Sequence, residues 1–382
     1  MDPMEPSVMV KQVQDLPNVM REQTRAIDFL VRNVLNPLEF LSVRRIYLVG
    51  DGDSYHASMA SELAFENIAK IPCEPMSAQR FLDYGAEWMP VPNPNSTLVV
   101  GISASGRTQR VIQSMERAKQ FRALTIGLTG TEGSPLTKAA DRTLSVQLPD
   151  MGPSPGIRTY SGSLLGLALL AIRIGELKNR YHQTEANNMR RELADLASIL
   201  EATIQATDAP AREAATAFKD ASPMVWVGSG PSYGTAIFSA AKTVEAAAVF
   251  AVGQDLEEWW HVERFALPSN MPTFIIAPPG RSYWRAVELA KTAKQMGRRL
   301  AAVVQDDDKE IAPLVDYVFP VVGQVREEFS PLVYHVAADL FASYLTDQLG
   351  RKLFQTDNPA FRLMMTGAQP QPQPQAQAQA AH

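Results

Sequence analysis

Hydroxyl side chains are concentrated in one short segment, residues 101–108, which reads GISASGRT. The segment follows a predicted buried strand and opens a predicted helix. Ser103, Ser105 and Thr108 would converge there with backbone N–H groups and the positive end of the helix dipole. The pattern predicts an anion site, most naturally for a phosphate group. The alternative is a simple N-cap, which needs only one hydroxyl and does not explain three hydroxyls around Gly106.

The segment does not fit the two common nucleotide-binding loops. It lacks the Gly-Lys-Ser/Thr ending of a Walker A loop. In the other glycine turn, residues 50–55, Tyr55 replaces the third glycine of a dinucleotide fingerprint. A single cysteine, Cys73, excludes a cysteine-rich zinc site, and five histidines leave little for a histidine-based one. We therefore expect neither a cofactor nor a metal.

A second candidate for chemistry is Glu245, which lies in a very apolar predicted helix, residues 232–250. Proton transfer to or from carbon needs a carboxylate shielded from water, and burial in such a helix raises the pKa of a carboxylate. A solvated glutamate paired with Lys242, three residues earlier, fits the composition equally well. The residues alone leave open whether Glu245 is a catalytic base.

The overall composition limits the classes of function. The chain has 382 residues, of which 46% are hydrophobic and 20% charged, so it can bury a core large enough for two domains. Its net charge of −5 argues against nucleic-acid binding by bulk charge. No signal peptide is visible, and the longest apolar run, residues 164–172, is too short to cross a bilayer. We expect a cytoplasmic protein that binds neither nucleic acid nor membrane.

Alternating strands and helices must position these residues. Short β-branched runs alternate with longer amphipathic stretches, which predicts an α/β fold with parallel sheets covered by helices on both faces. The predicted strands are 46–49, 98–100, 124–127, 144–146, 224–227, 273–276, 300–304 and 317–319. The predicted helices are 54–69, 108–120, 135–140, about 159–206, 232–250, 283–296 and 331–349.

The second half of the chain repeats the first. Residues 49–55 (VGDGDSY) match residues 227–233 (VGSGPSY) at five of seven positions, and each piece follows a strand and opens a helix. We expect one α/β unit used twice. The expected parts are a helical lead-in (1–40), a first domain (41–180), a helical connector (181–215), a second domain (216–350), a C-terminal segment (351–366) and a disordered Gln/Pro/Ala tail (367–382).

The chain resembles the double sugar-isomerase (SIS) domain proteins, the family that includes the isomerase domain of glucosamine-6-phosphate synthase. The resemblance rests on the 103–108 loop, the two glycine turns, and the spacing of sixteen residues from Glu245 to His261. It covers residues 9–364. It implies two tandem SIS domains, each a flavodoxin-like three-layer αβα unit.

The family implies a phosphosugar held by the first domain. The matching ligands are Ser54, Ser103, Ser105, Gly106, Thr108 and Thr159. In the second domain the matching segment, residues 277–281, reads APPGR and has no pair of serines, so this domain is expected to supply the acid–base groups. Arg107 and Arg158 lie beside the expected pocket. The sequence leaves two interpretations of these arginines open. They recognise a second anionic group, such as a carboxylate of an amino-acid adduct, or they are ordinary surface arginines.

The family also implies how the acid–base groups act. The residue that matches Glu245 moves a proton between C1 and C2 of the open-chain sugar, and the match to His261 assists ring opening from a neighbouring subunit. A homodimer with composite active sites follows from this. Lys242 joins them as a catalytic candidate or as the counter-ion of Glu245. Without the resemblance, His261 reads as a histidine packed beside two tryptophans.

Departures from the family pattern shape the functional hypothesis. Met364 stands where the synthase has a lysine, and we expect no glutaminase domain. We expect an enzyme acting on a hexose 6-phosphate, an amino-sugar 6-phosphate or a sugar–amine adduct by proton transfer between C1 and C2. It would be an aldose–ketose isomerase, or an amine-releasing deglycase or deaminase. The alternative is a non-catalytic phosphosugar sensor, and the presence of both Glu245 and His261 favours the enzyme.

Overall fold

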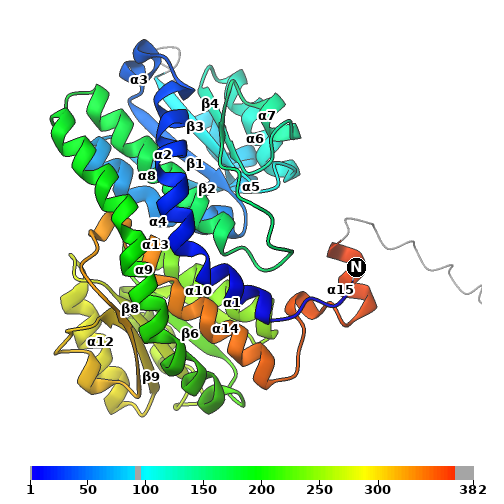
Figure 1. Cartoon of the computed structure of the whole chain (residues 1–382), viewed down its shortest axis with the longest axis vertical. Coiled ribbons are helices and arrows are strands. Elements are labelled where there is room, and N and C mark those ends of the chain that lie inside the picture. The colour runs from blue at the N-terminus through cyan, green and yellow to red at the C-terminus, as the bar shows by residue number, and fades with distance from the viewer. Residues whose placement is uncertain (1, 91–95, 366–382) are drawn as a thin grey trace, which may run out of the picture.

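Two five-stranded parallel sheets lie one above the other in the computed structural model, which describes residues 2–90 and 96–365 (Figure 1). The first sheet contains β1 (Arg45–Gly50), β2 (Cys73–Ser77), β3 (Thr97–Ile102), β4 (Leu124–Thr129) and β5 (Arg142–Ser145). The second contains β6 (Met224–Gly228), β7 (Ala251–Asp255), β8 (Pro272–Ala277), β9 (Arg299–Gln305) and β10 (Tyr317–Val321). Each sheet has the flavodoxin-like strand order 2-1-3-4-5 when its strands are numbered from its own start. The predicted α/β fold class is confirmed.

Helices cover the sheets and join them. The helices of the first half are α4 (Asp53–Leu63), α5 (Ala78–Arg80), α6 (Gln109–Gln120), α7 (Pro135–Ala139) and α8 (Arg158–Leu177). Those of the second half are α10 (Pro231–Ala247), α11 (Leu256–His261), α12 (Tyr283–Gln295), α13 (Pro331–Tyr334), α14 (Val336–Gln348) and α15 (Pro359–Met365). The helices α1 (Ser7–Gln14), α2 (Leu16–Val34) and α3 (Pro37–Ser42) come first, and the long α9 (Gln183–Phe218) runs beside α2 and past both sheets (Figure 1).

The predicted elements differ from the structure mainly at the edges. The prediction omits β2 and β7. Both are edge strands with half-buried polar residues, so neither shows the continuous apolar run of a central strand. The helix predicted to reach residue 250 ends at Ala247, because Ala248 adopts a left-handed conformation (φ 51°). The single helix predicted for 159–206 is two helices, α8 and α9, separated by a turn at 178–182. The predicted disordered tail, 367–382, lies outside the described residues.

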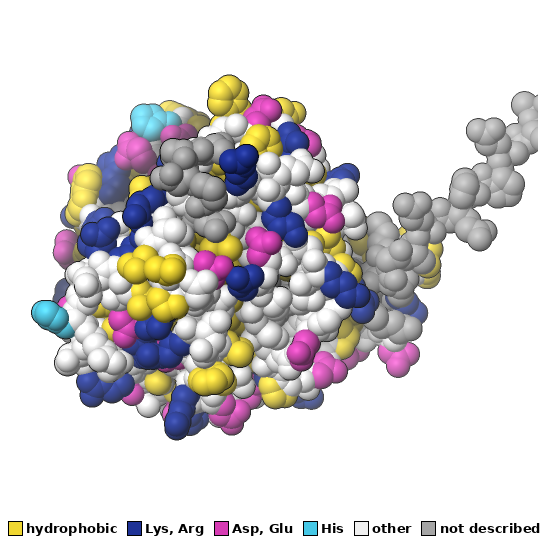
Figure 2. Space-filling model, turned by 90° about the horizontal axis from the view of Figure 1, so that it is seen from above, with side chains coloured by type: hydrophobic (Ala, Val, Ile, Leu, Met, Phe, Trp, Pro, Cys, Tyr) yellow, Lys and Arg dark blue, Asp and Glu magenta, His cyan; other side chains and the backbone are white. Residues whose placement is uncertain are grey.

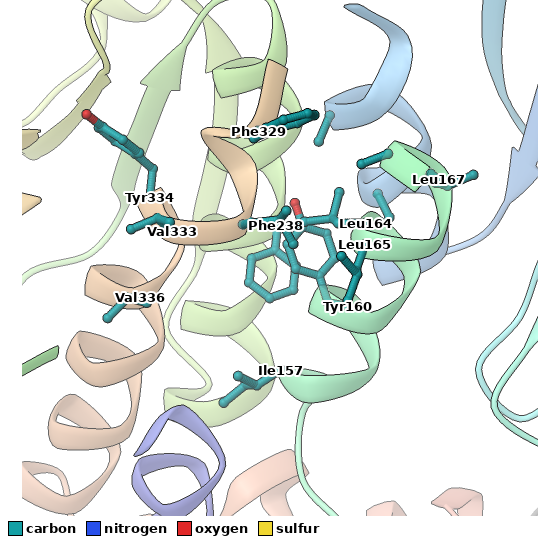
Figure 3. Packing of buried hydrophobic residues seen from close by; sticks show 14 of the residues in the cluster. Ile157, Tyr160, Leu164, Leu165, Leu167, Phe238, Phe329, Val333, Tyr334 and Val336 are labelled. Carbon is teal, nitrogen blue, oxygen red and sulfur yellow. The ribbon is translucent and has the colours of Figure 1, made fainter. Parts of the chain in front are cut away.

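The helix α8 lies in the core, packed against α2, α4 and α9. It is long and apolar enough to cross a bilayer, but 83% of its most apolar stretch is buried inside the protein, as in the central helix of a folded domain. Its Tyr160 stacks on Phe238 of α10, with ring centroids 3.8 Å apart, and Figure 3 shows the two rings side by side. Packing of α8 against α10 therefore connects the two halves through apolar contact.

Acidic and basic side chains are mixed on the face of the molecule seen in Figure 2. Lys and Arg side chains lie between Asp and Glu side chains, and no continuous basic surface is visible among the described residues of this face. A nucleic-acid site that works by bulk charge needs such a surface. The predicted lack of nucleic-acid binding stays a prediction.

Candidate active site

The hydroxyl loop lies at the carboxyl end of the central strand β3 and leads into α6. The Ser103 and Thr108 hydroxyls are hydrogen-bonded to each other at 2.9 Å, and the Ser105 hydroxyl accepts a bond from the Arg107 N–H at 3.3 Å. Thr108 occupies the N-cap position of α6, yet its side chain makes no capping bond. A simple N-cap does not explain this loop. The structure brings the Ser103 and Thr108 hydroxyls together at the N-terminus of α6, where the first helical N–H groups lack partners within the helix, as an anion site requires.

Gly106 fixes the shape of this loop. Its backbone has a positive φ of 62°, and a Cβ built on it would lie 2.0 Å from the Ser134 hydroxyl oxygen. Its carbonyl accepts a hydrogen bond from the Leu136 N–H at 3.0 Å. Both the conformation and the close approach exclude other residue types. The role of Gly106 is therefore to hold the loop in place against the next loop of the sheet.

The start of α4 lies beside the hydroxyl loop. Strand β1 pairs in parallel with β3, with Val49 opposite Gly101, so the segments after the two strands meet at one edge of the sheet. Asp53 and Ser54 begin α4 at this edge. The predicted ligand Ser54 therefore lies just after β1, at the same edge of the sheet as the hydroxyl loop.

Close packing of α4 and α10 brings the second half of the chain to this edge. A Cβ built on Gly234 of α10 would lie 2.4 Å from the backbone nitrogen of Ala60 of α4. Only glycine at residue 234 and a small residue at residue 60 allow the two helix backbones to approach so closely. Two turns further along α10, this packing delivers Lys242 and Glu245 to the start of α4.

One buried ammonium group connects the two halves at this point. The Lys242 side chain is completely buried, and its Nζ donates hydrogen bonds to Asp53 Oδ2 at 2.8 Å and to the Glu245 carboxylate. Asp53 belongs to α4, whereas the other two belong to α10. The carboxylate side chains retain 23% and 31% of their exposure. Glu245 is paired with Lys242, as one interpretation expected, but it is not a freely solvated glutamate.

The pKa values of the three groups move in directions that assign them different tasks. Burial raises the pKa of Glu245, and the nearby Asp53 carboxylate adds to the rise. Burial also acts upward on the pKa of Asp53, but attraction to Lys242 and His56 outweighs it, so this pKa is lowered. The pKa of Lys242 is raised, because attraction to the two carboxylates outweighs its burial. Asp53 and Lys242 thus stay charged, and Glu245 is the member suited to take up and release a proton.

Comparison with known proteins identifies part of this architecture. The family model "SIS domain" matches residues 39–151, which contain β1, α4, the hydroxyl loop and α6. Residues 39–151 form a SIS domain. The predicted family is thereby confirmed for residues 39–151, the part of the chain that contains the hydroxyl loop.

Curated relatives match a larger part of the chain. The glutamine–fructose-6-phosphate aminotransferase (isomerizing) of Thermococcus kodakarensis is 27% identical over 344 residues, covering 89% of this chain and 55% of the relative. The enzyme of the same name from Gloeobacter violaceus is 25% identical over 362 residues, covering 92% and 58%. The chain thus spans little more than half the length of these relatives, and the alignment extends well beyond the SIS domain.

Solved structures share the fold of both sheets. The C-terminal domain of glucosamine-fructose-6-phosphate aminotransferase from Francisella tularensis has a TM-score of 0.75 at 19% identity, covering 90% of this chain and 96% of that one. Glucosamine-6-phosphate deaminase from Thermotoga maritima has a TM-score of 0.71 at 18% identity, covering 90% and 95%. At these identities the likeness establishes the arrangement of the two sheets.

The two arginines predicted beside the pocket differ in their surroundings. Arg158 is buried at the start of α8, where its Nε lies 2.7 Å from Asp15 Oδ2 and its Nη1 donates to the Pro149 carbonyl at 2.5 Å. These contacts attach the start of α2 to the SIS domain, and both involve the Arg158 guanidinium. Arg107 is exposed in the hydroxyl loop. Of the two, only Arg107 is placed to meet a second anionic group of a ligand.

Thr159, predicted as a sugar contact, lies at the start of α8, near Asp53. A Cβ built on Gly156 would lie 2.9 Å from the Thr159 hydroxyl oxygen and 2.6 Å from Asp53 Oδ2. The exposed Thr159 hydroxyl and the Asp53 carboxylate therefore lie on either side of residue 156. The start of α8 closes the site opposite the start of α4.

His261 lies apart from this cluster within one chain. It ends α11, its side chain is 68% exposed, and its Nε2 lies 3.3 Å from Glu257 Oε1. The largest charge effects on the Glu245 pKa come from Lys242, Asp53 and His56. The interpretation of His261 as a histidine packed beside tryptophans does not describe so exposed a ring. Its action on a neighbouring subunit stays a prediction.

The counterpart of the hydroxyl loop in the second half is filled by a side chain of the protein. The Arg281 N–H donates to Glu327 Oε1 at 3.1 Å, and a Cβ built on Gly280 would lie 2.5 Å from the same oxygen. A carboxylate of the chain thus occupies the turn where the SIS domain would hold an anion. This agrees with the absence of a serine pair from the sequence of the second loop.

Sequence reasoning missed two members of the cluster, Asp53 and His56. Asp53 makes a direct bond to Lys242, and the largely buried His56 has its Nδ1 3.6 Å from Asp53 Oδ1. The available signal was weak: an acidic residue in the first turn of a helix is common for electrostatic reasons alone. Met364, predicted to replace a lysine of the synthase, lies in α15, and its side chain lies outside the described part of the chain.

Proposed function

We propose that this protein is a phosphosugar-converting enzyme that transfers a proton between C1 and C2 of a hexose 6-phosphate or an amino-sugar 6-phosphate. One observation carries the proposal: Glu245, from the second half of the chain, is held at the start of α4, at the same edge of the first sheet as the hydroxyl loop. Phosphate at the loop would hold one end of the sugar, and Glu245 would face its carbon skeleton. The enzyme would act in the cytoplasm.

The proposed reaction needs only a positioned base. With the ring open, the Glu245 carboxylate takes the proton from the carbon next to the carbonyl, which leaves an enediolate. A proton then passes from the hydroxyl of that carbon to the former carbonyl oxygen, and the Glu245 carboxyl group returns its proton to the former carbonyl carbon. The net result is conversion of an aldose to a ketose, or the reverse. With a 2-amino sugar the same transfer gives an imine at C2, which water hydrolyses to a ketose phosphate and ammonia. His261 of a second subunit would assist ring opening.

The names of the relatives support this class of substrate. Isomerizing aminotransferases of fructose 6-phosphate match most of the chain, and a glucosamine-6-phosphate deaminase shares its fold. Proton transfer between C1 and C2 is the step that isomerase and deaminase chemistry have in common. We propose this step for the chain, with an amine-releasing deglycase or deaminase as the more specific form.

Solvent deuterium exchange tests the proposed reaction directly. The full chain is incubated in deuterium oxide with fructose 6-phosphate, glucosamine 6-phosphate and a fructosyl-amino-acid 6-phosphate, and each sugar is followed by NMR. We expect deuterium at C1 or C2 of at least one sugar, because the proton held by Glu245 exchanges with solvent before it returns. Tight binding of these sugars without any exchange would identify a sensor and overturn the proposed reaction.

Removal of two loop hydroxyls should weaken phosphate binding specifically. In Ser105→Ala/Thr108→Ala, we expect the Kd for a hexose 6-phosphate to rise at least about a hundredfold, because each of the two hydrogen bonds to a charged group contributes about 1.5–3 kcal/mol. The thermal midpoint should barely change. Thr216→Ala removes a hydroxyl that bonds only to its own helix and serves as the control for calorimetric titration. Equal affinity of the double variant and the control would contradict the assigned anion site.

A further inference from the structure

We infer that Asp53 recognises the amino group of the substrate and makes the site selective for amino-sugar phosphates over neutral sugar phosphates. This inference rests on the proposed function and names the substrate class of the same site. Asp53 is a binding residue in this reading, and Glu245 remains the base. The simpler interpretation is that Asp53 acts only as the counter-ion of Lys242. The two interpretations predict different ratios between the affinities for an amino-sugar phosphate and a neutral sugar phosphate.

The position of Asp53 places its carboxylate against the carbon skeleton of a bound sugar. Asp53 directly precedes Ser54, the ligand predicted at the start of α4. Its Oδ2 lies 2.6 Å from where a Cβ at residue 156 would be, and the Thr159 hydroxyl oxygen lies 2.9 Å from the same point. Lys242 links it to Glu245. Asp53 therefore lies between two predicted sugar contacts and the predicted base.

The charges of the site have an order from one end to the other. At the loop, hydroxyls and helical N–H groups form an end that favours an anion. At the other end, two partly exposed carboxylates share a single ammonium, and the lysine side chain that carries it is completely buried. A ligand meets partly exposed carboxylate groups there and not the lysine. A molecule with a phosphate at one end and an ammonium at the other is complementary to this arrangement.

Asp53 also has unused capacity to accept hydrogen bonds. Its Oδ2 accepts one bond from Lys242, and its Oδ1 is a buried atom without a hydrogen-bond partner among the described residues. The Nδ1 of His56, a ring that is 8% exposed, also lacks such a partner and lies 3.6 Å from Asp53 Oδ1, too far for a hydrogen bond. A carboxylate left with a free acceptor in a buried position favours a ligand that brings donors, and an ammonium brings three.

A matched pair of unreactive ligands tests the inference. The probes are 2-amino-2-deoxyglucitol 6-phosphate and glucitol 6-phosphate, open-chain compounds that differ only at C2 and have no carbonyl to react. In the full wild-type chain we expect the amino compound to bind about tenfold more tightly, or better, the range of a hydrogen bond to a charged group. In Asp53→Asn this preference should disappear. Asp51→Asn, a carboxylate in the same turn that accepts a bond from the Ala78 N–H, should keep it.

The outcomes separate this inference from the proposed function. Wild-type binding of both probes with equal affinity overturns the amine selectivity and leaves the phosphosugar site standing. Equal weakening of both probes in Asp53→Asn shows that Asp53 serves only Lys242, which also overturns the inference. Failure of the wild type to bind either probe overturns the proposed function itself. The ratio of the wild-type affinities for the two probes shows whether the site is selective for an amine, even if Asp53→Asn does not fold.

Discussion

Replacement of Glu245 by glutamine should lower the rate of proton exchange at C1 and C2 by about 10²–10⁴-fold, the usual contribution of a general base. The amide oxygen can still accept the hydrogen bond from Lys242, so the cluster and the fold should persist. Affinity for the sugar phosphate should remain close to that of the wild type, because the loop that holds the phosphate is unchanged. Single-turnover NMR in deuterium oxide measures the exchange, and calorimetry measures the binding.

A matched control keeps this result specific. Glu201→Gln changes a half-exposed glutamate of α9 that pairs with Arg21, far along the chain from the cluster, and should leave the exchange rate as it is. The pH profile of the wild type provides a second readout. A base must be ionised to act, and burial raises the Glu245 pKa, so the rate should rise with pH above the range in which an ordinary glutamate ionises. Exchange by Glu245→Gln within tenfold of wild type would remove Glu245 from the chemistry.

The part of the site that the sequence predicts is the part built from local segments. The hydroxyl loop needs only a strand, a short turn and a helix in succession, and those signals lie within twelve residues. The pairing of Lys242 with Glu245 is likewise local, three residues apart on one helix. Alternation of strands and helices along the chain predicts a parallel sheet. The fold class is therefore predictable, although the edge strands β2 and β7 are not.

The missed part depends on contacts between distant segments. Asp53 meets Lys242 from 189 residues away, and the meeting depends on the close approach of α4 and α10 at Gly234. No local pattern encodes that approach. Arg158 is the reverse case: its position in the sequence placed it beside the pocket, but Asp15, from the start of the chain, holds its guanidinium. Single charged residues can be interpreted safely only when their partner is local.

Replacement of Lys242 by methionine should cost about 3 kcal/mol of unfolding free energy at neutral pH, the lower end of the range for removing one partner of a buried ion pair. The lower end applies because the two carboxylates keep 23% and 31% of their side-chain exposure. Methionine has nearly the shape of the lysine stem, so the loss reports the missing charge. Lys119→Met, which removes the exposed partner of Asp141 at 3.9 Å, should cost at most about 1 kcal/mol.

The pH dependence of the Lys242→Met loss distinguishes missing charge from poor packing. Without the ammonium, Asp53 and Glu245 are buried carboxylates with raised pKa values, so their contribution is most favourable in acid and is lost as the pH rises through those values. In the wild type the lowered pKa of Asp53 acts the other way, and its stabilisation disappears as the pH falls through that value. Between about pH 7 and about pH 4, acidification thus helps the variant through both carboxylates but the wild type only through Glu245, because the lowered pKa of Asp53 lies below this range. Urea unfolding should be measured from about pH 7 to about pH 4, close to the ordinary carboxylate pKa range. The difference in unfolding free energy between the wild type and Lys242→Met should shrink on acidification, whereas a packing defect would keep this difference constant.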